Sequence, residues 1–421
     1  MSTAAATDVP DKKTPKKQSR LFANAQRLGR SLLLPIAVMP AAGILNRLGQ
    51  SDMLGAIPGF EQGASVIGAA GSAIFTWLPL LFAVGIAIGW AKKSDGTTAL
   101  AAVVGYMVVY EVWKVMSPIV LAGVKDANGG QKMIDYGVLG GIVMGLVAAV
   151  LWQKFHRTKM PDFLGFFSGR RLVPIITAAA GLVIAVLMSF VFRYFDIALT
   201  AAGQAVADNA VIGGGVFGFV NRMLIPIGLH QLLNFFPWFQ LGSFNDGTTI
   251  WHGDIARFLH GDPTAGIFQT GFFPIMMFAL PAGALAIWRN AKPQNRKVVG
   301  GIMISAALTS FVTGITEPLE YSFMFVAFPL YVIHAVLTGT SLALVNALGI
   351  RDGFSFSAGA IDYVLNFGKA DGAIWLIPIG LAYAVVYYFL FSFVIKKWNL
   401  RTPGREDDTI AENTIDAATK P

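Results

Sequence analysis

Long uninterrupted apolar segments constrain the fold of this chain more than any other feature of its sequence. Five of them precede residue 200, near residues 32–48, 73–91, 97–116, 137–153 and 173–192. A helix that crosses a membrane needs about 20 consecutive apolar residues. Strands of a membrane barrel would instead give short segments of alternating hydrophobicity. The segments therefore predict an all-α polytopic membrane protein.

Composition supports this class and excludes others. Only 13% of the 421 residues are charged, and 55% are hydrophobic, whereas a soluble domain carries about 25% charged residues. The net charge of +8 comes from Lys and Arg between apolar segments, so it indicates membrane orientation and no nucleic-acid partner. The chain has no cysteine, which excludes disulfides, thiolate metal sites and a cysteine nucleophile within it.

Basic residues predict the orientation of the chain. Residues 1–19 are polar and rich in Lys, which is typical of a disordered tail, and residues 20–31 have the pattern of an interfacial amphipathic helix. No Lys or Arg occurs in residues 49–72. By the positive-inside rule we expect both termini in the cytoplasm. Basic clusters at residues 92–93, 154–171, 289–297 and 396–405 fit this orientation, whereas Arg47, Lys125 and Lys132 fit it less well.

Two later regions cannot be simple spans. If the clusters are all cytoplasmic, residues 211–240 must cross the membrane an even number of times, and so must residues 298–395. The second region has three apolar stretches, near residues 298–315, 319–349 and 373–395. We therefore expect re-entrant or broken helices, which are tolerated only where they are buried or line a wet cavity.

Polar residues concentrate in the first irregular region. Arg222 taken alone could be a helix-end residue reaching the interface, and His230 alone could be a satisfied core histidine. Their grouping on one irregular segment favours a binding site. The run Gly213–Gly215 indicates close helix packing, because no GK[ST] follows it as in a phosphate loop. The polar set is Asn221, Arg222, His230, Gln231 and Asn234.

The second irregular region carries two glutamates, Glu317 and Glu320, around Pro318. An Asp-type charge at a helix centre costs about 2.5–3.5 kcal/mol on insertion scales. Pro318 predicts a helix start, with Glu317 as its cap at the positive end of the dipole. Glu317 could be a cap alone, but Ser, Thr or Asp would cap at lower cost. We expect Glu317 to accept hydrogen bonds from a hydroxylated solute.

A third stretch places polar residues between two apolar segments. They are Ser355, Ser357, Asp362 and Asn366. The stretch is typical of a polar loop that enters a cavity, and a simple surface loop is the alternative.

Six ordered motifs carry a resemblance to a known family. They are "GRSLLLPIAVMPAAGIL", "NRMLIPIGLHQLLN", "HGDIARFLHGDPTAG", "GITEPLEYSFMF", "GFSFSAGAIDYVL" and "LRTPGRED", between Leu21 and Asp407. The chain resembles the bacterial phosphotransferase sugar permeases, specifically the enzyme IIC domain of the glucose/N-acetylglucosamine branch. The motifs "GLHQLLN" and "GFSFSAGAIDYVL" are most similar to the N-acetylglucosamine members. Glucose members more typically have histidines where Gln231 and Ala358 stand, so glucose is the alternative sugar.

The resemblance implies an architecture. It implies about ten transmembrane helices, two re-entrant hairpins, a homodimer in the bacterial inner membrane and an elevator-type transport movement. The implied divisions are a basic cytoplasmic tail (1–19), an amphipathic helix with a dimerisation and scaffold half (20–200), a sugar-binding transport half (201–395) and a cytoplasmic C-terminal tail (396–421).

The resemblance also implies sugar contacts and a partner. The family's sugar-contacting glutamate, histidine and arginine match Glu317, His230 and Arg222. Many relatives continue into a B domain whose cysteine carries the phosphoryl group, and this chain has no cysteine. We expect a separate phosphorylated B protein, which makes the chain the membrane component of a sugar phosphotransferase, without cofactor or metal. The predicted substrate-binding set is Glu317, His230, Arg222, Gln231, Thr316, Asn234, Ser357 and Asn366.

The chemistry expected of this chain is limited. Because phosphoryl transfer depends mostly on positioning and charge stabilisation, binding is the expected role of Glu317, with a role as base for the sugar hydroxyl as an alternative. The alternative in a different functional class is an ion-coupled sugar carrier that performs no chemistry. A requirement for phosphorylated B protein would distinguish the two.

Overall fold

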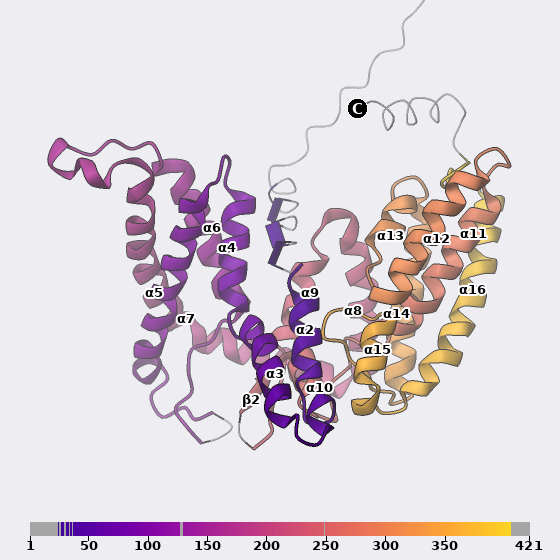
Figure 1. The fold of residues 1–421 in the computed structure, drawn as a ribbon, viewed down its shortest axis with the longest axis horizontal. Coiled ribbons are helices and arrows are strands. Elements are labelled where there is room, and N and C mark those ends of the chain that lie inside the picture. Colours follow the sequence, from indigo (N-terminus) through magenta and orange to yellow (C-terminus); the bar gives the residue numbers. More distant parts are fainter. Residues whose placement is uncertain are drawn as a thin grey trace, which may run out of the picture.

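The structure is a computed structural model that describes residues 24, 27–28, 31–32, 34–35, 37–126, 129–247 and 249–405. The predicted tail 1–19, residues 406–421 and most of the predicted amphipathic helix lie outside the described residues. The rest forms two groups of helices, called here the first half and the second half (Figure 1).

The first half is a helical bundle with a short broken pair beside it. The helix α5 is capped by Asp95, whose side chain accepts a hydrogen bond from the Thr97 amide. Aromatic residues such as Trp113 and Tyr136 stack in the core, with ring centroids 5.2 Å apart. The elements are α2 (Met39–Leu48), η1 (Leu54–Ala56), α3 (Glu61–Thr76), α4 (Leu78–Trp90), α5 (Gly96–Val120), α6 (Val138–Phe155), η2 (Asp162–Phe167), η3 (Gly169–Arg171) and α7 (Leu172–Asp208).

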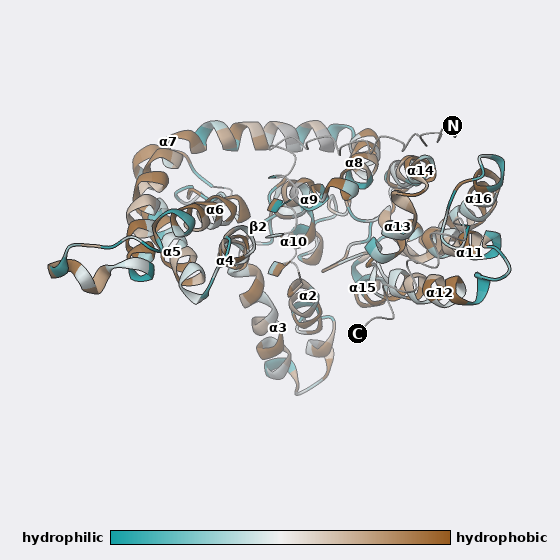
Figure 2. Ribbon diagram, turned by 90° about the horizontal axis from the view of Figure 1, so that it is seen from above, coloured by the Kyte–Doolittle hydropathy of each residue, from teal (hydrophilic) through white to brown (hydrophobic). Residues whose placement is uncertain are grey.

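One long helix joins the halves. The helix α7 has 37 residues, well beyond the apolar segment 173–192 that the sequence predicts. Its later part runs across the molecule from the first half to α8 (Figure 2).

The second half contains shorter and more interrupted elements. They are α8 (Ala210–Leu224), η4 (Ile225–Ile227), α9 (His230–Phe239), β1 (Ser243–Asn245), β2 (Ile250–His252), α10 (Gly253–Leu259), the π-helical η5 (Pro274–Ala279), α11 (Leu280–Asn290), α12 (Arg296–Thr313), α13 (Glu317–Met324), α14 (Phe328–Ala347), α15 (Ala360–Asn366), η6 (Phe367–Lys369), η7 (Ala373–Trp375) and α16 (Leu376–Lys397). The strands form a small antiparallel hairpin with Phe244 opposite Trp251. The described residues are otherwise mostly helical, as predicted.

Both regions predicted to be irregular are broken helices. Residues 211–240 divide into α8 and α9 at Gly228, whose φ of +72° favours glycine. The stretch 319–349 divides into α13 and α14 between residues 324 and 328. The prediction that Glu317 caps α13 is wrong by one residue, because Thr316 is the N-cap and Glu317 is the first helical residue.

Small residues let α8 approach α14 closely. A Cβ built on Gly215 would lie 3.1 Å from the Ala343 side chain, and one on Gly218 would lie 2.9 Å from that of Leu342. The glycine run beginning at Gly213 therefore serves helix packing, as predicted.

The number of spans is only partly settled by helix length. Among the described residues, six helices are long and apolar enough to cross a membrane, or up to seven if the bent pair α3 and α4, at 52°, is one span. The count of about ten stays a prediction.

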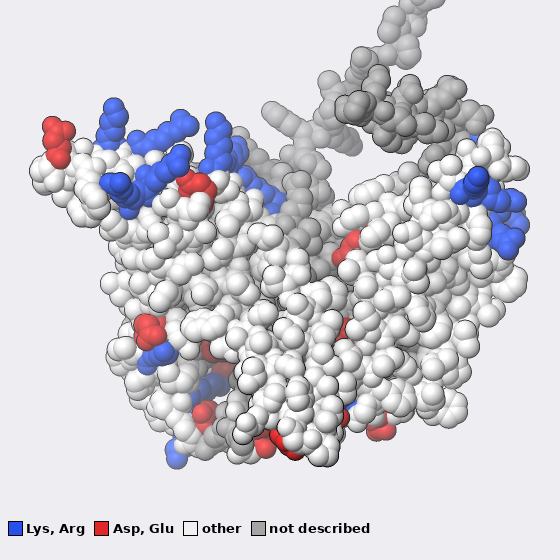
Figure 3. Space-filling model, in the orientation of Figure 1, with Lys and Arg blue, Asp and Glu red and all other residues white. Residues whose placement is uncertain are grey.

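Basic side chains gather at one edge of both halves. Figure 3 shows Lys and Arg along the upper edge, where the connections α4–α5, α6–α7 and α11–α12 and the end of α16 lie (Figure 1). Two of the less fitting residues are in ion pairs, since Arg47 contacts Asp52 at 2.7 Å and Lys132 contacts Asp196 at 2.6 Å. Figure 3 also shows a few Lys and Arg at the lower left, but the upper edge is the more basic one, as the positive-inside rule requires of one membrane face.

Candidate functional site

A cavity of about 390 Å³ lies between the broken helices of the second half and the first half. Met39 of α2 and Phe82 of α4 contribute to it from the first half. Seven predicted substrate-binding residues line it, namely Arg222, His230, Gln231, Asn234, Thr316, Glu317 and Ser357. We call it the Glu317 cavity. Its volume falls within the range of about 300–1,000 Å³ that is usual for small-molecule sites.

Glu317 and His230 face the same space from two helix starts. Each is the first residue of its helix, α13 for Glu317 and α9 for His230. Glu317 Oε1 lies 3.8 Å from His230 Nε2, too far for a direct hydrogen bond. Neither ring nitrogen of the buried His230 has a hydrogen-bond partner among the described residues. A carboxylate and an imidazole are thus both available to a ligand.

Arg222 belongs to a network of buried hydrogen bonds that extends into the interior of the second half. Its Nη1 donates to Glu320 Oε1 at 2.8 Å and to Thr316 Oγ1 at 3.1 Å. His334 Nε2 lies 2.8 Å from the same Glu320 oxygen, and His334 Nδ1 lies 2.9 Å from the Tyr387 hydroxyl. Glu320 and His334 are fully buried, so they fix the guanidinium rather than contact a ligand.

Two polar atoms of this hydrogen-bond network have no partner among the described residues. Arg222 Nε and Glu320 Oε2 are buried and have no hydrogen-bond partner among the described residues. The Arg222 guanidinium also lies over the Phe272 ring, 4.9 Å from its centroid. The unpaired Nε leaves Arg222 with a donor for a bound solute.

Side-chain amides join the two helices of the first irregular region. Asn221 of α8 donates to Asn234 of α9, and Asn234 Nδ2 donates to Gln231 Oε1 at 3.4 Å. Asn221 also lines the Glu317 cavity. Among the described residues, no protein acceptor pairs with the NH₂ group of Gln231.

The loop after α14 brings one serine to the cavity. The Asp362 carboxylate accepts hydrogen bonds from the amides of Ser355, at 2.8 Å, and Ser357, at 3.3 Å. Burial raises the pKa of Asp362 to about 6, and these backbone donors oppose the shift. The surface-loop alternative is wrong, because Ser355 and Asp362 are buried.

Two residues lie away from the cavity lining. Asn366 donates to the Gly353 carbonyl at 2.9 Å and holds the loop from inside. Ala358, at the position where glucose members carry histidine, is fully buried in a hydrophobic core of the second half. Ala358 therefore provides no room in this cavity for a substituent of the ligand.

Sequence reasoning missed His334 and Tyr387, and it gave Glu320 no role. His334 is a lone histidine within the apolar helix α14, and that isolation is the signal that could have found it. Tyr387 gives no such signal, because tyrosines are common in apolar helices and its partner lies 53 residues away.

The arrangement suits a neutral hydroxylated ligand. Glu317 supplies acceptors, His230 and Arg222 supply donors, and Gln231 supplies both. Aromatic residues Trp238, Tyr321 and Phe356 also line the cavity. Apolar walls with a few convergent polar groups are the usual composition of small-molecule sites.

Comparisons with known proteins agree with this geometry. Residues 29–339 match the model of the family "Phosphotransferase system, EIIC". This chain belongs to that family. It is 53% identical over 420 residues to the "PTS system N-acetylglucosamine-specific EIIC component" of Streptomyces coelicolor, covering 99% of this chain and 100% of that protein.

Other relatives of the EIIC chain are longer. It is 48% identical to the N-acetylglucosamine-specific EIICB component of Bacillus subtilis, covering 92% of this chain and 80% of that one. It is 46% identical to the glucosamine-specific EIICBA component of the same organism, covering 94% of this chain and 61% of that one.

A solved structure shares the fold. It is the transporter ChbC, the IIC component of the N,N'-diacetylchitobiose-specific phosphotransferase system, with a TM-score of 0.59 at 14% identity. The match covers 90% of this chain and 94% of ChbC.

Proposed function

We propose that this EIIC chain is an N-acetylglucosamine-specific permease whose transport is coupled to phosphorylation of the sugar 6-hydroxyl. The observation that carries the proposal is the Glu317 cavity, in which broken helices present Glu317, His230, Arg222 and Gln231 to one space. Helix breaks that aim polar groups at a substrate are a common device of membrane transporters. The names of the S. coelicolor and B. subtilis relatives support N-acetylglucosamine as the sugar.

Each polar group has a role in this proposal. Glu317 accepts hydrogen bonds from sugar hydroxyls, and His230 and Arg222 donate to others. Thr316, Asn234 and Ser357 complete the lining. Gln231 donates to and accepts from the acetamido group, because a carboxamide can do both at once. Asn366 holds the loop that carries Ser357 and does not touch the sugar.

The phosphoryl group comes from a partner. The chain's 421 residues contain no cysteine, so the cysteine-phosphorylated B component lies outside them. In the transfer, the S–P bond of the phosphocysteine breaks and the bond from phosphorus to the sugar O6 forms. The proton of the O6 hydroxyl is transferred to Glu317 or to water. The product carries a charge of about −1.5 to −2, which disfavours return to the outside.

The membrane arrangement belongs to the same proposal. The chain spans the bacterial inner membrane about ten times, with two re-entrant hairpins, cytoplasmic termini and a homodimer contact in residues 20–200. Residues 201–395 carry the sugar in an elevator movement, and the tails 1–19 and 396–421 are cytoplasmic. Support comes from the basic edge shared by both halves (Figure 3).

Uptake by membrane vesicles tests the function. Labelled N-acetylglucosamine should accumulate as its phosphate only when phosphorylated B protein is supplied. Unlabelled N-acetylglucosamine should compete more strongly than glucose or glucosamine. Accumulation of unmodified sugar without B protein would instead identify an ion-coupled carrier. Equal competition by glucose would identify a glucose permease or a broad hexose permease.

A further inference from the structure

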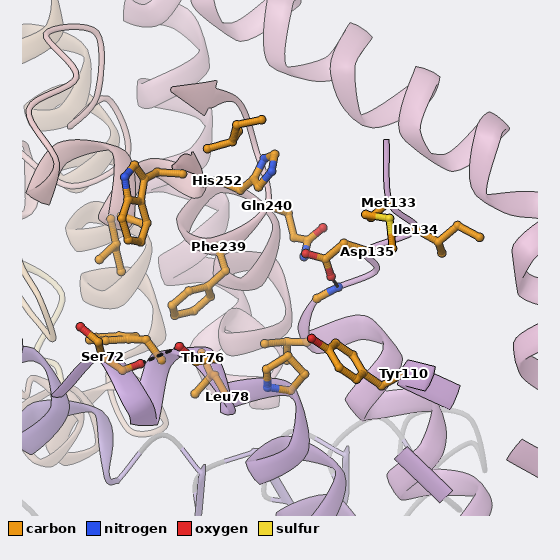
Figure 4. Close-up of a pocket in the computed structure, with 18 of the residues that line it drawn as sticks. Ser72, Thr76, Leu78, Tyr110, Met133, Ile134, Asp135, Phe239, Gln240 and His252 are labelled. Atoms are coloured by element: carbon orange, nitrogen blue, oxygen red, sulfur yellow. Dashed lines mark hydrogen bonds between the residues drawn. The ribbon is translucent and has the colours of Figure 1, made fainter. Parts of the chain in front are cut away.

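A second and larger cavity, of about 520 Å³, lies between the two halves. Its walls come from α3, α4, α5 and residues 133–138 of the first half and from α9, β2 and α10 of the second half (Figure 4). None of the residues that the proposed function uses lines it. We call it the outer cavity.

The helix α9 contributes residues to both cavities. His230, at the start of α9, lines the Glu317 cavity, and Gln240, just after its end, lines the outer cavity. Phe239 lines both. The helix has 10 residues, which corresponds to about 15 Å at 1.5 Å per residue. The outer cavity adjoins α3, β2 and α10, at the edge opposite the basic residues (Figures 1 and 3). In the proposed orientation it faces the outside.

The outer cavity combines aromatic walls with a few polar groups, among them Asp135, whose Oδ1 accepts a hydrogen bond from the Gly137 amide. Tyr110 and Trp251 supply rings from the two halves. Gln240 is only 9% exposed, and it lines the cavity. Figure 4 shows Gln240 beside Asp135, with His252 nearby. The carboxamide of Gln240 can donate to and accept from a ligand in the cavity at the same time.

The charges of this lining favour a neutral ligand. Lys114 is the only Lys or Arg among the described residues that line the outer cavity, and its Nζ donates to Glu111 at 2.8 Å. Burial lowers the pKa of His260, so this side chain is neutral at pH 7. A phosphorylated or carboxylated ligand would find no unpaired cation here. The polar groups equally disfavour a lipid chain, which cannot form hydrogen bonds with Gln240 or Asp135.

We infer that the outer cavity is a second saccharide site, which holds a neutral N-acetylhexosamine on the outer face before the Glu317 cavity receives one. The inference rests on the proposed function for the choice of sugar and of side. Gln240 pairs with the acetamido group or a hydroxyl, and Asp135 and His252 bind further hydroxyls. Tyr110 and Trp251 cover the apolar faces of the ring.

The absence of native cysteine allows a direct test. In a Glu317→Gln background, which weakens the first site, Met133→Cys is exposed to a membrane-impermeant maleimide added outside intact cells; Met133 lines the outer cavity and carries none of the proposed sugar contacts. We expect N-acetylglucosamine to slow labelling at least threefold and mannitol to leave it unchanged. The matched control is Gln131→Cys, an exposed position that lines neither cavity. Its labelling should not respond to sugar.

Two further variants assign the protection to this lining. Adding Gln240→Ala, or separately Tyr110→Ala, should abolish the protection. An unchanged thermal stability in detergent verifies that these variants fold. Equal labelling with and without sugar, in cells whose Glu317-intact parent takes up N-acetylglucosamine, overturns the outer site and leaves the proposed function standing. If the parent takes up no N-acetylglucosamine, the proposed function itself fails.

Discussion

Away from the contact between them, the two halves of this EIIC chain differ in whether they bury charged side chains. In the first half, Thr177 and Ser189 are buried and donate to the carbonyl four residues earlier in their own helix. In the second half, Arg222, Glu320 and His334 are buried and depend on partners from other helices. The hydroxyls need no particular tertiary arrangement, whereas the charges do. This contrast is what the proposed division into a scaffold half and a sugar-binding half requires.

The halves meet at a contact that includes a fully buried arginine of the first half. Arg47 of α2 donates through Nε to the Leu365 carbonyl of α15 at 2.8 Å and pairs with Asp52. Burial acts to raise the pKa of Asp52, but the Arg47 guanidinium lowers it overall, so Asp52 stays charged at neutral pH. Lys369 of the second half lies 3.9 Å from Asp52. Any elevator movement of one half past the other must break this contact.

The largest expected effect comes from removing Glu320. The substitution Glu320→Ala leaves Arg222 buried without its carboxylate, which costs about 3–5 kcal/mol for a broken buried pair. We expect a large loss of thermal stability in detergent and loss of uptake. Ser189→Ala, which removes a hydroxyl of the first half bonded to its own helix, should cost about 1 kcal/mol or less. Similar losses for both would remove the distinction between the halves.

A cross-link between the halves tests their relative movement. Asp52→Cys and Lys369→Cys, joined by a short reducible bismaleimide, should abolish uptake, because the contact can no longer open. Reduction of the linker should restore uptake. The singly substituted proteins treated with the same reagent are the controls. Full uptake in the cross-linked protein would mean that residues 20–200 and 201–395 do not move apart at this contact during transport.

A smaller effect is expected on sugar selectivity. Gln231→His should reduce the preference for N-acetylglucosamine over glucose about tenfold, roughly one hydrogen bond. The measurement is competition in vesicle uptake, and Gln131→His is the matched control outside both cavities. Ala358→His should lower stability instead, because Ala358 is fully buried. An unchanged preference in Gln231→His would place the acetamido contact elsewhere, with Asn234 the next candidate.

The sequence predicts local features of this molecule well. The break at Pro318, the polar group from Arg222 to Asn234 and the apolar segments are all short-range signals, and the structure has them. The buried hydrogen-bond network of the second half could not be predicted from local sequence, because Arg222 and Glu320 are 98 residues apart and meet only through helix packing. No local sequence motif predicts the outer cavity either, because the residues that line it are spread between Asn46 and His260.

Long-range geometry also decides between residues that look alike in sequence. Ser357 and Asn366 are both polar residues of one stretch, yet only Ser357 reaches the Glu317 cavity. The Asp362 carboxylate accepts a hydrogen bond from the Ser357 amide, whereas the Asn366 side chain donates to the Gly353 carbonyl within the loop.

The most direct test of the account is sugar binding to purified Glu317→Gln protein. The account predicts that the protein inserts and keeps its thermal stability, while its affinity for N-acetylglucosamine at the main site falls at least tenfold. Such a loss corresponds to the roughly 1.5–3 kcal/mol of a hydrogen bond to a charged group. Glu61→Gln, an exposed glutamate of the first half, should bind sugar as the parent does. Near-normal affinity in Glu317→Gln would contradict the assignment of the Glu317 cavity as the sugar site.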